Sequence, residues 1–193
     1  MELVFATNNK NKIKEVQKLI PNNIKLLSLE DIGCFEDIPE TQDTIGGNAI
    51  QKAQYVKKNY GYNCFADDTG LEVSALNGAP GVYSARYAGK AKDPEANMKK
   101  LLSALSGKND RSAQFKTVIA LMVNDHTSTF TGICKGKITK EKFGDGGFGY
   151  DPIFKPDGFE ETFAEMDLEL KNHIGHRGKA TKKLIEFLSQ QKL

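Results

Sequence analysis

The sequence contains no tryptophan, only three cysteines, and no long hydrophobic segment. The cysteines are an odd number without CxxC spacing, which argues against a disulfide framework and against a structural zinc site. No apolar run approaches the roughly 20 residues that a membrane-spanning helix needs. The apolar run at the start is short and is soon followed by Asn and Lys, unlike a signal peptide. We therefore expect a cytoplasmic protein with no membrane partner.

A large charge of either sign is also lacking. The 27 basic and 25 acidic residues leave a net charge of +2, so no strong overall field attracts nucleic acid. The balance and the lack of a basic stripe predict no nucleic-acid partner, and any affinity for phosphate must be local. Without repeats, low-complexity tracts or linkers, residues 1–193 are expected to form a single domain.

Short apolar runs that alternate with amphipathic segments predict an α/β fold with an extended mixed sheet flanked by helices. We expect a helix capped by Asn48 and a final helix with Ala180, Leu184 and Leu188 on its buried side. Strands are expected at residues 3–6, 24–29, 63–66, 113–123 and 127–139, the last two forming an antiparallel hairpin.

The polar segment after the first predicted strand is a candidate phosphate site. It opens a helix, whose free backbone N–H groups favour an anion, and it lacks the GxxxxGK[ST] pattern of a P-loop. A capping segment with solvated lysines is the alternative interpretation. The segment consists of Thr7, Asn8, Asn9, Lys10, Asn11 and Lys12.

Two adjacent acids, Asp67 and Asp68, follow the short strand 63–66. We expect the strand to end there, because Asp, Thr and Gly favour turns. Acids at the carboxyl end of a strand are natural ligands for Mg²⁺, although an Asx-turn or a helix cap would also explain them.

Two further stretches stand out. Residues 141–155 are rich in glycine, and Phe148 or Tyr150 could stack on a flat ring; a glycine-rich hairpin is the alternative. His176 and Arg177, at the start of the last predicted helix, can donate hydrogen bonds to a carbonyl or a phosphate, although such pairs are usually surface residues.

Five motifs together carry a resemblance to a known family. They are ATNNKNK, PET followed by NAIQKA, ADDTGLEVSALNGAPGVYSARYAG, GGFGYDPIF and LKNHIGHRGKA. From Phe5 to Ala180 the chain resembles the inosine triphosphate pyrophosphatase family, also called Ham1-like. The resemblance implies Mg²⁺-dependent hydrolysis of ITP, dITP and XTP to the monophosphate and pyrophosphate. It also implies a homodimer whose subunits have a cleft between two lobes.

The resemblance also implies roles for individual residues. Asp68 would be the proton acceptor and a metal ligand, and Glu40 a second metal ligand. The phosphates would bind to Thr7–Lys12 and Lys52, and Thr69 would contact the substrate. The remaining residues would form the nucleoside pocket: Phe148, Gly149, Tyr150, Asp151, Lys171, His176 and Arg177.

The chain departs from the family pattern at three positions. Gly47 stands where many members carry Glu. Any contact of that acid with the metal or with water is therefore absent here, and Glu40 must carry more of the metal binding. Thr69 replaces the more usual Ser and keeps the hydroxyl. Gly175 replaces a Ser that often precedes the His-Arg pair.

Two other functions remain open from the sequence. One is a Maf-like pyrophosphatase with a different base preference. The other is a nucleotide-binding protein without turnover, against which the retained Asp68, Glu40 and Lys52 argue.

Overall fold

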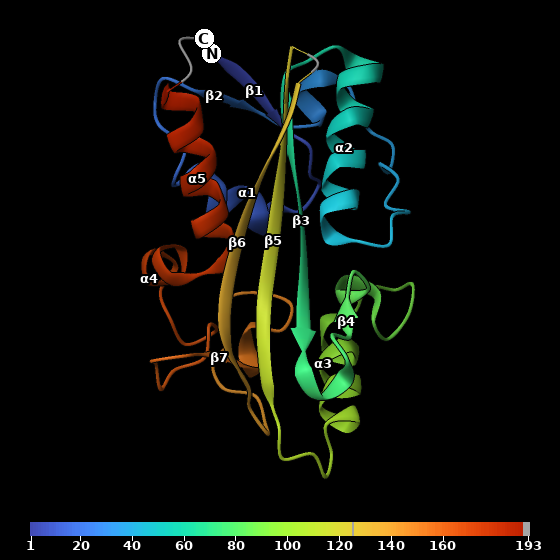
Figure 1. The fold of residues 1–193 in the computed structure, drawn as a ribbon, viewed down its shortest axis with the longest axis vertical. Coiled ribbons are helices and arrows are strands. Elements are labelled where there is room, and N and C mark those ends of the chain that lie inside the picture. The colour runs from blue at the N-terminus through green and yellow to red at the C-terminus, as the bar shows by residue number, and fades with distance from the viewer. Residues whose placement is uncertain (125, 191–193) are drawn as a thin grey trace. The chain divides into compact units, whose positions relative to one another are not determined.

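The computed structural model describes residues 1–124 and 126–190, which form a mixed sheet flanked by helices (Figure 1). The strands are β1 (Glu2–Phe5), β2 (Lys25–Leu27), β3 (Cys64–Val73), β4 (Pro80–Gly81), β5 (Ser112–Val123), β6 (His126–Ile138) and β7 (Phe154–Pro156). Their order in the sheet is β2-β1-β3-β5-β6-β7, with β4 paired to β3. β1 runs parallel to both β2 and β3, whereas β4 runs antiparallel to β3 and β7 runs antiparallel to β6. This confirms the expected α/β fold with a mixed sheet. None of the helices in the described part of the chain is both long and apolar enough to cross a membrane.

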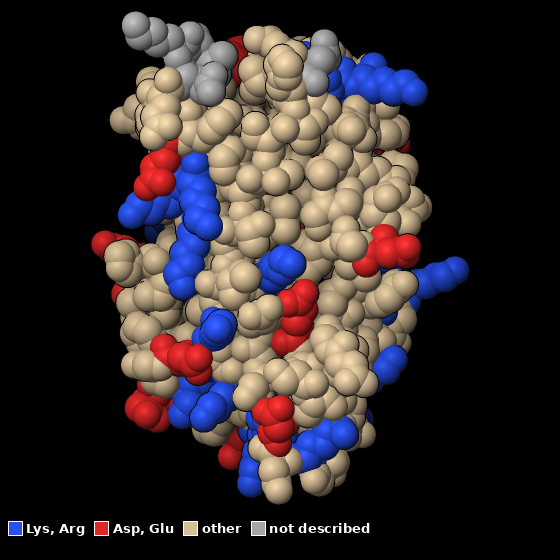
Figure 2. Space-filling view, in the orientation of Figure 1, with Lys and Arg blue, Asp and Glu red and all other residues tan. Residues whose placement is uncertain are grey.

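The described chain forms two compact units. The first comprises Met1–Asp68, Thr117–Gly132 and the stretch from Arg177 onward; the second comprises Thr69–Lys116 and Ile133–His176. On the face drawn in Figure 2, basic and acidic side chains are interspersed among other residues, in keeping with the small net charge.

The first unit is built on parallel strands with helices packed against them. Its helices and strands are β1 (Glu2–Phe5), α1 (Lys10–Gln17), β2 (Lys25–Leu27), α2 (Ile45–Tyr60), the first part of β3, β5 from Thr117 onward, β6 up to Gly132, and α5 (His176–Gln190) from Arg177 onward. One of its hydrophobic clusters joins Phe65 of β3 to Val16 of α1 and to Ala180, Leu184 and Leu188 of α5. The predicted buried face of the last helix is therefore confirmed.

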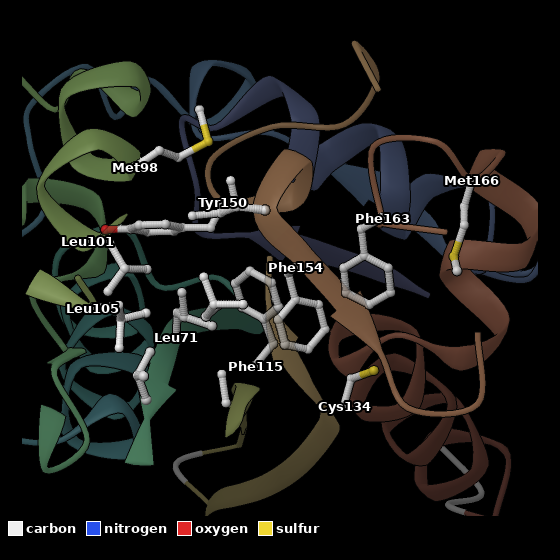
Figure 3. Close-up of a cluster of buried hydrophobic side chains, with 14 residues drawn as sticks. Leu71, Met98, Leu101, Leu105, Phe115, Cys134, Tyr150, Phe154, Phe163 and Met166 are labelled. Atoms are coloured by element: carbon white, nitrogen blue, oxygen red, sulfur yellow. The ribbon is translucent and has the colours of Figure 1, made fainter. Parts of the chain in front are cut away.

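The second unit holds its own aromatic core, drawn in Figure 3. Phe115 of β5 (Ser112–Val123) lies 4.7 Å from Phe154 of β7 (Phe154–Pro156), measured between ring centroids. Met98 and Leu101 of α3 (Pro94–Ala104) pack in the same cluster. The other elements are β4 (Pro80–Gly81), β6 (His126–Ile138), of which residues from Ile133 belong here, and α4 (Leu168–Ile174).

The expectation that a strand ends at Asp67 is wrong. β3 runs from Cys64 to Val73, so both acids lie inside a strand. Asp disfavours strands by propensity, but packing and charge pairing decide the conformation here. Asp67 is fully buried and Asp68 is 9% exposed, and cations contact both.

The cap of α2 also differs from expectation. The helix begins at Ile45, and the Thr44 hydroxyl accepts the N–H of Gly47, so Thr44 and not Asn48 is the N-cap. Asn48 lies one turn inside the helix and is buried. Its side chain is thereby available for contacts outside the helix.

The predicted link between β5 and β6 falls partly on residue 125, outside the described residues.

Candidate active site

The polar segment before α1 combines capping with exposed polar groups. Asn9 Oδ1 accepts the backbone N–H groups of Asn11 (3.0 Å) and Lys12 (3.3 Å), and Thr7 Oγ1 accepts that of Asn9 (3.2 Å). The capping interpretation therefore holds for Asn9. The side chains of Asn8, Lys10 and Asn11 are exposed and remain accessible to an anion at this helix start.

Asp67 is the centre of a buried charge network. Its carboxylate lies 2.8 Å from Lys12 Nζ and 2.9 Å from Arg177 Nε, and Arg177 Nη1 also pairs with Glu15. Burial alone would raise the pKa of Asp67, but Lys12 and Arg177 outweigh it and hold the pKa below its usual range. Asp67 is therefore a permanent anion that fixes two cations.

Asp68, the next residue, has the opposite environment. Lys52 Nζ lies 3.8 Å from Asp68 Oδ1 and 2.6 Å from Glu40 Oε1. Burial raises the pKa of Asp68, and the attraction of Lys52 and Lys12 does not reverse the increase. A carboxyl with a raised pKa is better suited to accept a proton than its neighbour is.

Strand geometry explains why adjacent acids differ. Successive side chains of a strand point to opposite faces. Asp67 shares the face of Phe65 and contacts α1 and α5, whereas Asp68 contacts Asn48 and Lys52 of α2. In Figure 1, α2 lies on one side of the strands of this unit, and α1 and α5 lie on the other.

The glycine at position 47 is explained by close packing. A Cβ there would lie 2.8 Å from Gln42 Cβ and 2.9 Å from Thr44 Oγ1, so any larger residue requires the loop to shift. At Gly175 a Cβ would collide with the carbonyl oxygen of Lys171. Both departures from the family pattern therefore fit the local backbone of this chain.

The second unit brings three predicted residues together. Lys171 Nζ lies 2.6 Å from Asp151 Oδ2, which also accepts the N–H of Phe148 at 2.7 Å. The ammonium lies 4.8 Å from the centroid of the Phe148 ring. This half-buried ring is thus held by a buried ion pair and a cation–π contact.

The other predicted residues of this unit differ in exposure. Tyr150 is buried in the aromatic core and donates its hydroxyl to the carbonyl oxygen of Ser84 (2.8 Å). His176 is buried, and its ring stacks on Phe115 at 4.5 Å between centroids. Thr69 and Gly149 are half-buried. Of the two aromatic candidates for base stacking, Phe148 is therefore the more accessible.

Sequence reasoning missed two buried polar residues of the first unit, Glu15 and Asn48. Glu15 lies three residues after Lys12, on the same face of α1, and this spacing was the available signal. Asn48 was interpreted as a cap, which hid its contact with Asp68 at 3.3 Å.

The described part of the chain contains no metal site made of three or more acidic, His or Cys side chains. Within residues 1–124 and 126–190, no three His, Cys, Asp or Glu side chains gather closely enough to hold a metal ion. Glu40 and Asp68, on either side of Lys52, are a pair of carboxylates. Such a pair suits Mg²⁺, which usually takes one or two carboxylates together with waters and substrate phosphates.

Known proteins resemble this chain over its whole length. The model of the Ham1 family matches residues 3–187. The dITP/XTP pyrophosphatase of Flavobacterium johnsoniae is 65% identical, with 100% of both chains covered, and that of Porphyromonas gingivalis is 52% identical, with 97% of both covered. The solved Ham1 protein of Staphylococcus aureus is 41% identical with a TM-score of 0.91, over 100% of both chains. The HAM1 protein of Coxiella burnetii is 41% identical with a TM-score of 0.92, over 99% of this chain and 100% of that one. By sequence and by structure, the chain belongs to the Ham1 family.

Proposed function

We propose that the protein hydrolyses the triphosphates of deaminated purines, ITP, dITP and XTP, to the nucleoside monophosphate and pyrophosphate. The observation that carries the proposal is the buried Asp68, which faces Lys52 and lies next to the permanently charged Asp67. The names of the relatives, dITP/XTP pyrophosphatase, support the same reaction.

The triphosphate would bind to the first unit. The segment Thr7–Lys12 offers backbone N–H groups at a helix start together with exposed amides and a lysine. Lys52 adds a second cation beside Asp68. Charge of this kind, fixed before the substrate arrives, stabilises the phosphate oxygens as negative charge develops on them.

Mg²⁺ is the proposed cofactor, and Asp68 and Glu40 would hold it. Their fit rests on two oxygen ligands near one ammonium, an arrangement that leaves the remaining ligands to water and phosphate. When bound, the ion would neutralise charge on the triphosphate.

The chemical step needs a base beside the attacking water. Asp68 would accept a proton from that water as its oxygen attacks the α-phosphorus, and the bond to the bridging oxygen would break to release pyrophosphate. The raised pKa of Asp68 supports this role, whereas the lowered pKa of Asp67 does not. Asp67 instead would keep Lys12 and Arg177 in place.

The base would bind where Phe148 can stack on a purine ring. Gly149, Tyr150, Asp151 and Lys171 would shape this pocket, and Thr69 would contact the substrate. His176 and Arg177 would donate to the 6-carbonyl that hypoxanthine and xanthine share and adenine lacks. A site built on such donors can reject the analogue that leaves them unpaired by about 10⁴ or more.

The biological role proposed is removal of deaminated purines from the nucleotide pool before polymerases use them. We propose that the enzyme acts as a homodimer in the cytoplasm. The three cysteines are buried thiols, which agrees with a reducing compartment.

Pyrophosphate release from ITP, XTP, dITP, GTP, ATP and dTTP, each with Mg²⁺ and with EDTA, tests the proposal. We expect rapid, metal-dependent release from the first three, with ATP slower by orders of magnitude. Activity confined to dTTP would indicate a Maf-like base preference. Binding without release from any substrate would overturn the enzymatic assignment.

A further inference from the structure

Asn48 connects two parts of the candidate active site through a single amide. Its Oδ1 accepts the backbone N–H of Gln42 at 2.9 Å, and its Nδ2 donates to Asp68 Oδ2 at 3.3 Å. The partners determine the orientation of the amide, because a backbone N–H can only donate and an ionised carboxylate can only accept. The side chain is 1% exposed, so neither contact competes with bulk water.

The position of Asn48 on α2 places it beside the other site residues. Lys52 follows one turn later on the same face and lies near Asp68 Oδ1, while Asn48 bonds Oδ2. Gln42, whose backbone Asn48 holds, is two residues after Glu40 in the chain. One amide therefore links the strand that carries Asp68 to the loop that carries Glu40.

Other contacts hold the same loop without reaching Asp68. Gln51 accepts the N–H of Thr41 at 2.9 Å and donates to its hydroxyl at 2.8 Å. Glu36 accepts the hydroxyls of Tyr55 (2.9 Å) and Tyr60 (2.7 Å) from α2. Asn48 differs from these residues because its second hydrogen bond goes to the carboxylate of Asp68.

We propose that Asn48 is a positioning residue that orients the Asp68 carboxylate for the reaction. By bonding Oδ2, it restrains rotation of the carboxylate and directs Oδ1 toward Lys52. The inference rests on the proposed function, since Asp68 is assigned there as the base. Removing a group that orients a metal-binding side chain typically costs about 10- to 100-fold in metal affinity or activity.

Three variants test the proposal against a loop-anchoring role. Asn48→Ala removes both contacts. Asn48→Asp keeps an acceptor for Gln42 but replaces the donor to Asp68 with a carboxylate oxygen. Gln51→Ala, the matched control, removes two contacts to the loop and none to Asp68.

We expect kcat for ITP to fall about 10- to 100-fold in both Asn48 variants, with KM changed by less than about threefold. Gln51→Ala should keep kcat within about threefold of the wild type, and melting temperatures check that each variant folds. If Asn48→Asp retains wild-type kcat, or if Gln51→Ala loses as much as Asn48→Ala, Asn48 anchors the loop only and the proposal is wrong.

An NMR measurement that leaves Asn48 in place and changes Asp68 gives a second test. In ¹⁵N-labelled protein, Asp68→Asn should shift the side-chain NH₂ resonances of Asn48 and leave those of Gln51 in place. Unchanged Asn48 resonances would contradict the contact even if the Asn48 variants fail to fold. If the wild-type protein hydrolyses none of the triphosphates, the proposed function is wrong. The NMR experiment does not depend on activity and would still test the contact between Asn48 and Asp68.

Discussion

The two units of the chain each bury ionised side chains, but in different ways. In the first unit Asp67 pairs with two cations and Arg177 pairs with two acids, so these two buried charges each have more than one partner. In the second unit one pair, Asp151 and Lys171, lies against the rings of Phe148 and Phe163. The first unit thus shares charges within a network, whereas the second sets an ion pair against aromatic rings.

Asp67 and Asp68 show the same principle at the scale of one residue. Shared cations lower the pKa of Asp67, while burial raises that of Asp68. A carboxylate with several cations is fixed as an anion and holds structure. A carboxylate with less compensation can exchange a proton and do chemistry.

Asp68→Asn is expected to have the largest effect. Because the amide cannot accept the proton of the attacking water, kcat for ITP should fall by about 10²- to 10⁴-fold. Steady-state kinetics measure the loss, and circular dichroism checks the fold. A variant with nearly normal turnover would remove Asp68 from the role of base.

Arg177→Met tests whether the network depends on shared partners. The substitution leaves Asp67 and Glu15 buried with less compensation, which should cost about 3–5 kcal/mol of unfolding free energy in urea titrations. Adding Asp67→Asn should recover little, because Glu15 and Lys12 still lose a partner. Full recovery in the double variant would show that the pair Asp67–Arg177 acts alone.

Lys171→Met makes the matching test in the second unit. Asp151 then loses its buried ion pair with Lys171, so a destabilisation of similar size, about 3–5 kcal/mol, is expected. Here the double variant with Asp151→Asn should recover most of it, since the amide oxygen can still accept the N–H of Phe148. Equal behaviour of the two double variants would erase the contrast between the units.

Glu36 predicts a smaller, pH-dependent effect on stability. Hydrogen bonds from Tyr60 and Tyr55 lower the pKa of its carboxyl to about 2, below the value of about 4.3 expected in the unfolded chain. The carboxylate therefore stabilises the fold above about pH 5, and this contribution is lost as the pH falls toward 2. The difference in melting temperature between the wild type and Glu36→Gln should shrink over that interval. A difference that is constant or grows on acidification would contradict the prediction.

Local sequence patterns predicted the elements well but not the partners of the charged residues. Ala180, Leu184 and Leu188 repeat at helical spacing, and all three are buried. The pairing of Arg177 with Asp67 spans 110 residues and that with Glu15 spans 162. No local pattern reports such contacts, and the strand through Asp67 and Asp68 was missed for this reason. Propensity favoured a turn, whereas distant cations make the buried strand stable.

The assigned roles of the site residues remain predictions that came from the resemblance to the family. The structure adds the neighbours that sequence did not indicate, above all Asn48 behind Asp68. Asn48 looked like a helix cap because Asn commonly occupies that position. Only the hydroxyl of Thr44 at the actual helix start showed otherwise.

Hydrolysis of ITP in water enriched with ¹⁸O tests the central claim most directly. Attack of water on the α-phosphorus predicts that the new oxygen appears in inosine monophosphate and that the pyrophosphate carries none, as mass spectrometry of the two products would show. Label in pyrophosphate, or release of single phosphates instead, would contradict the reaction proposed for Asp68 and its neighbours.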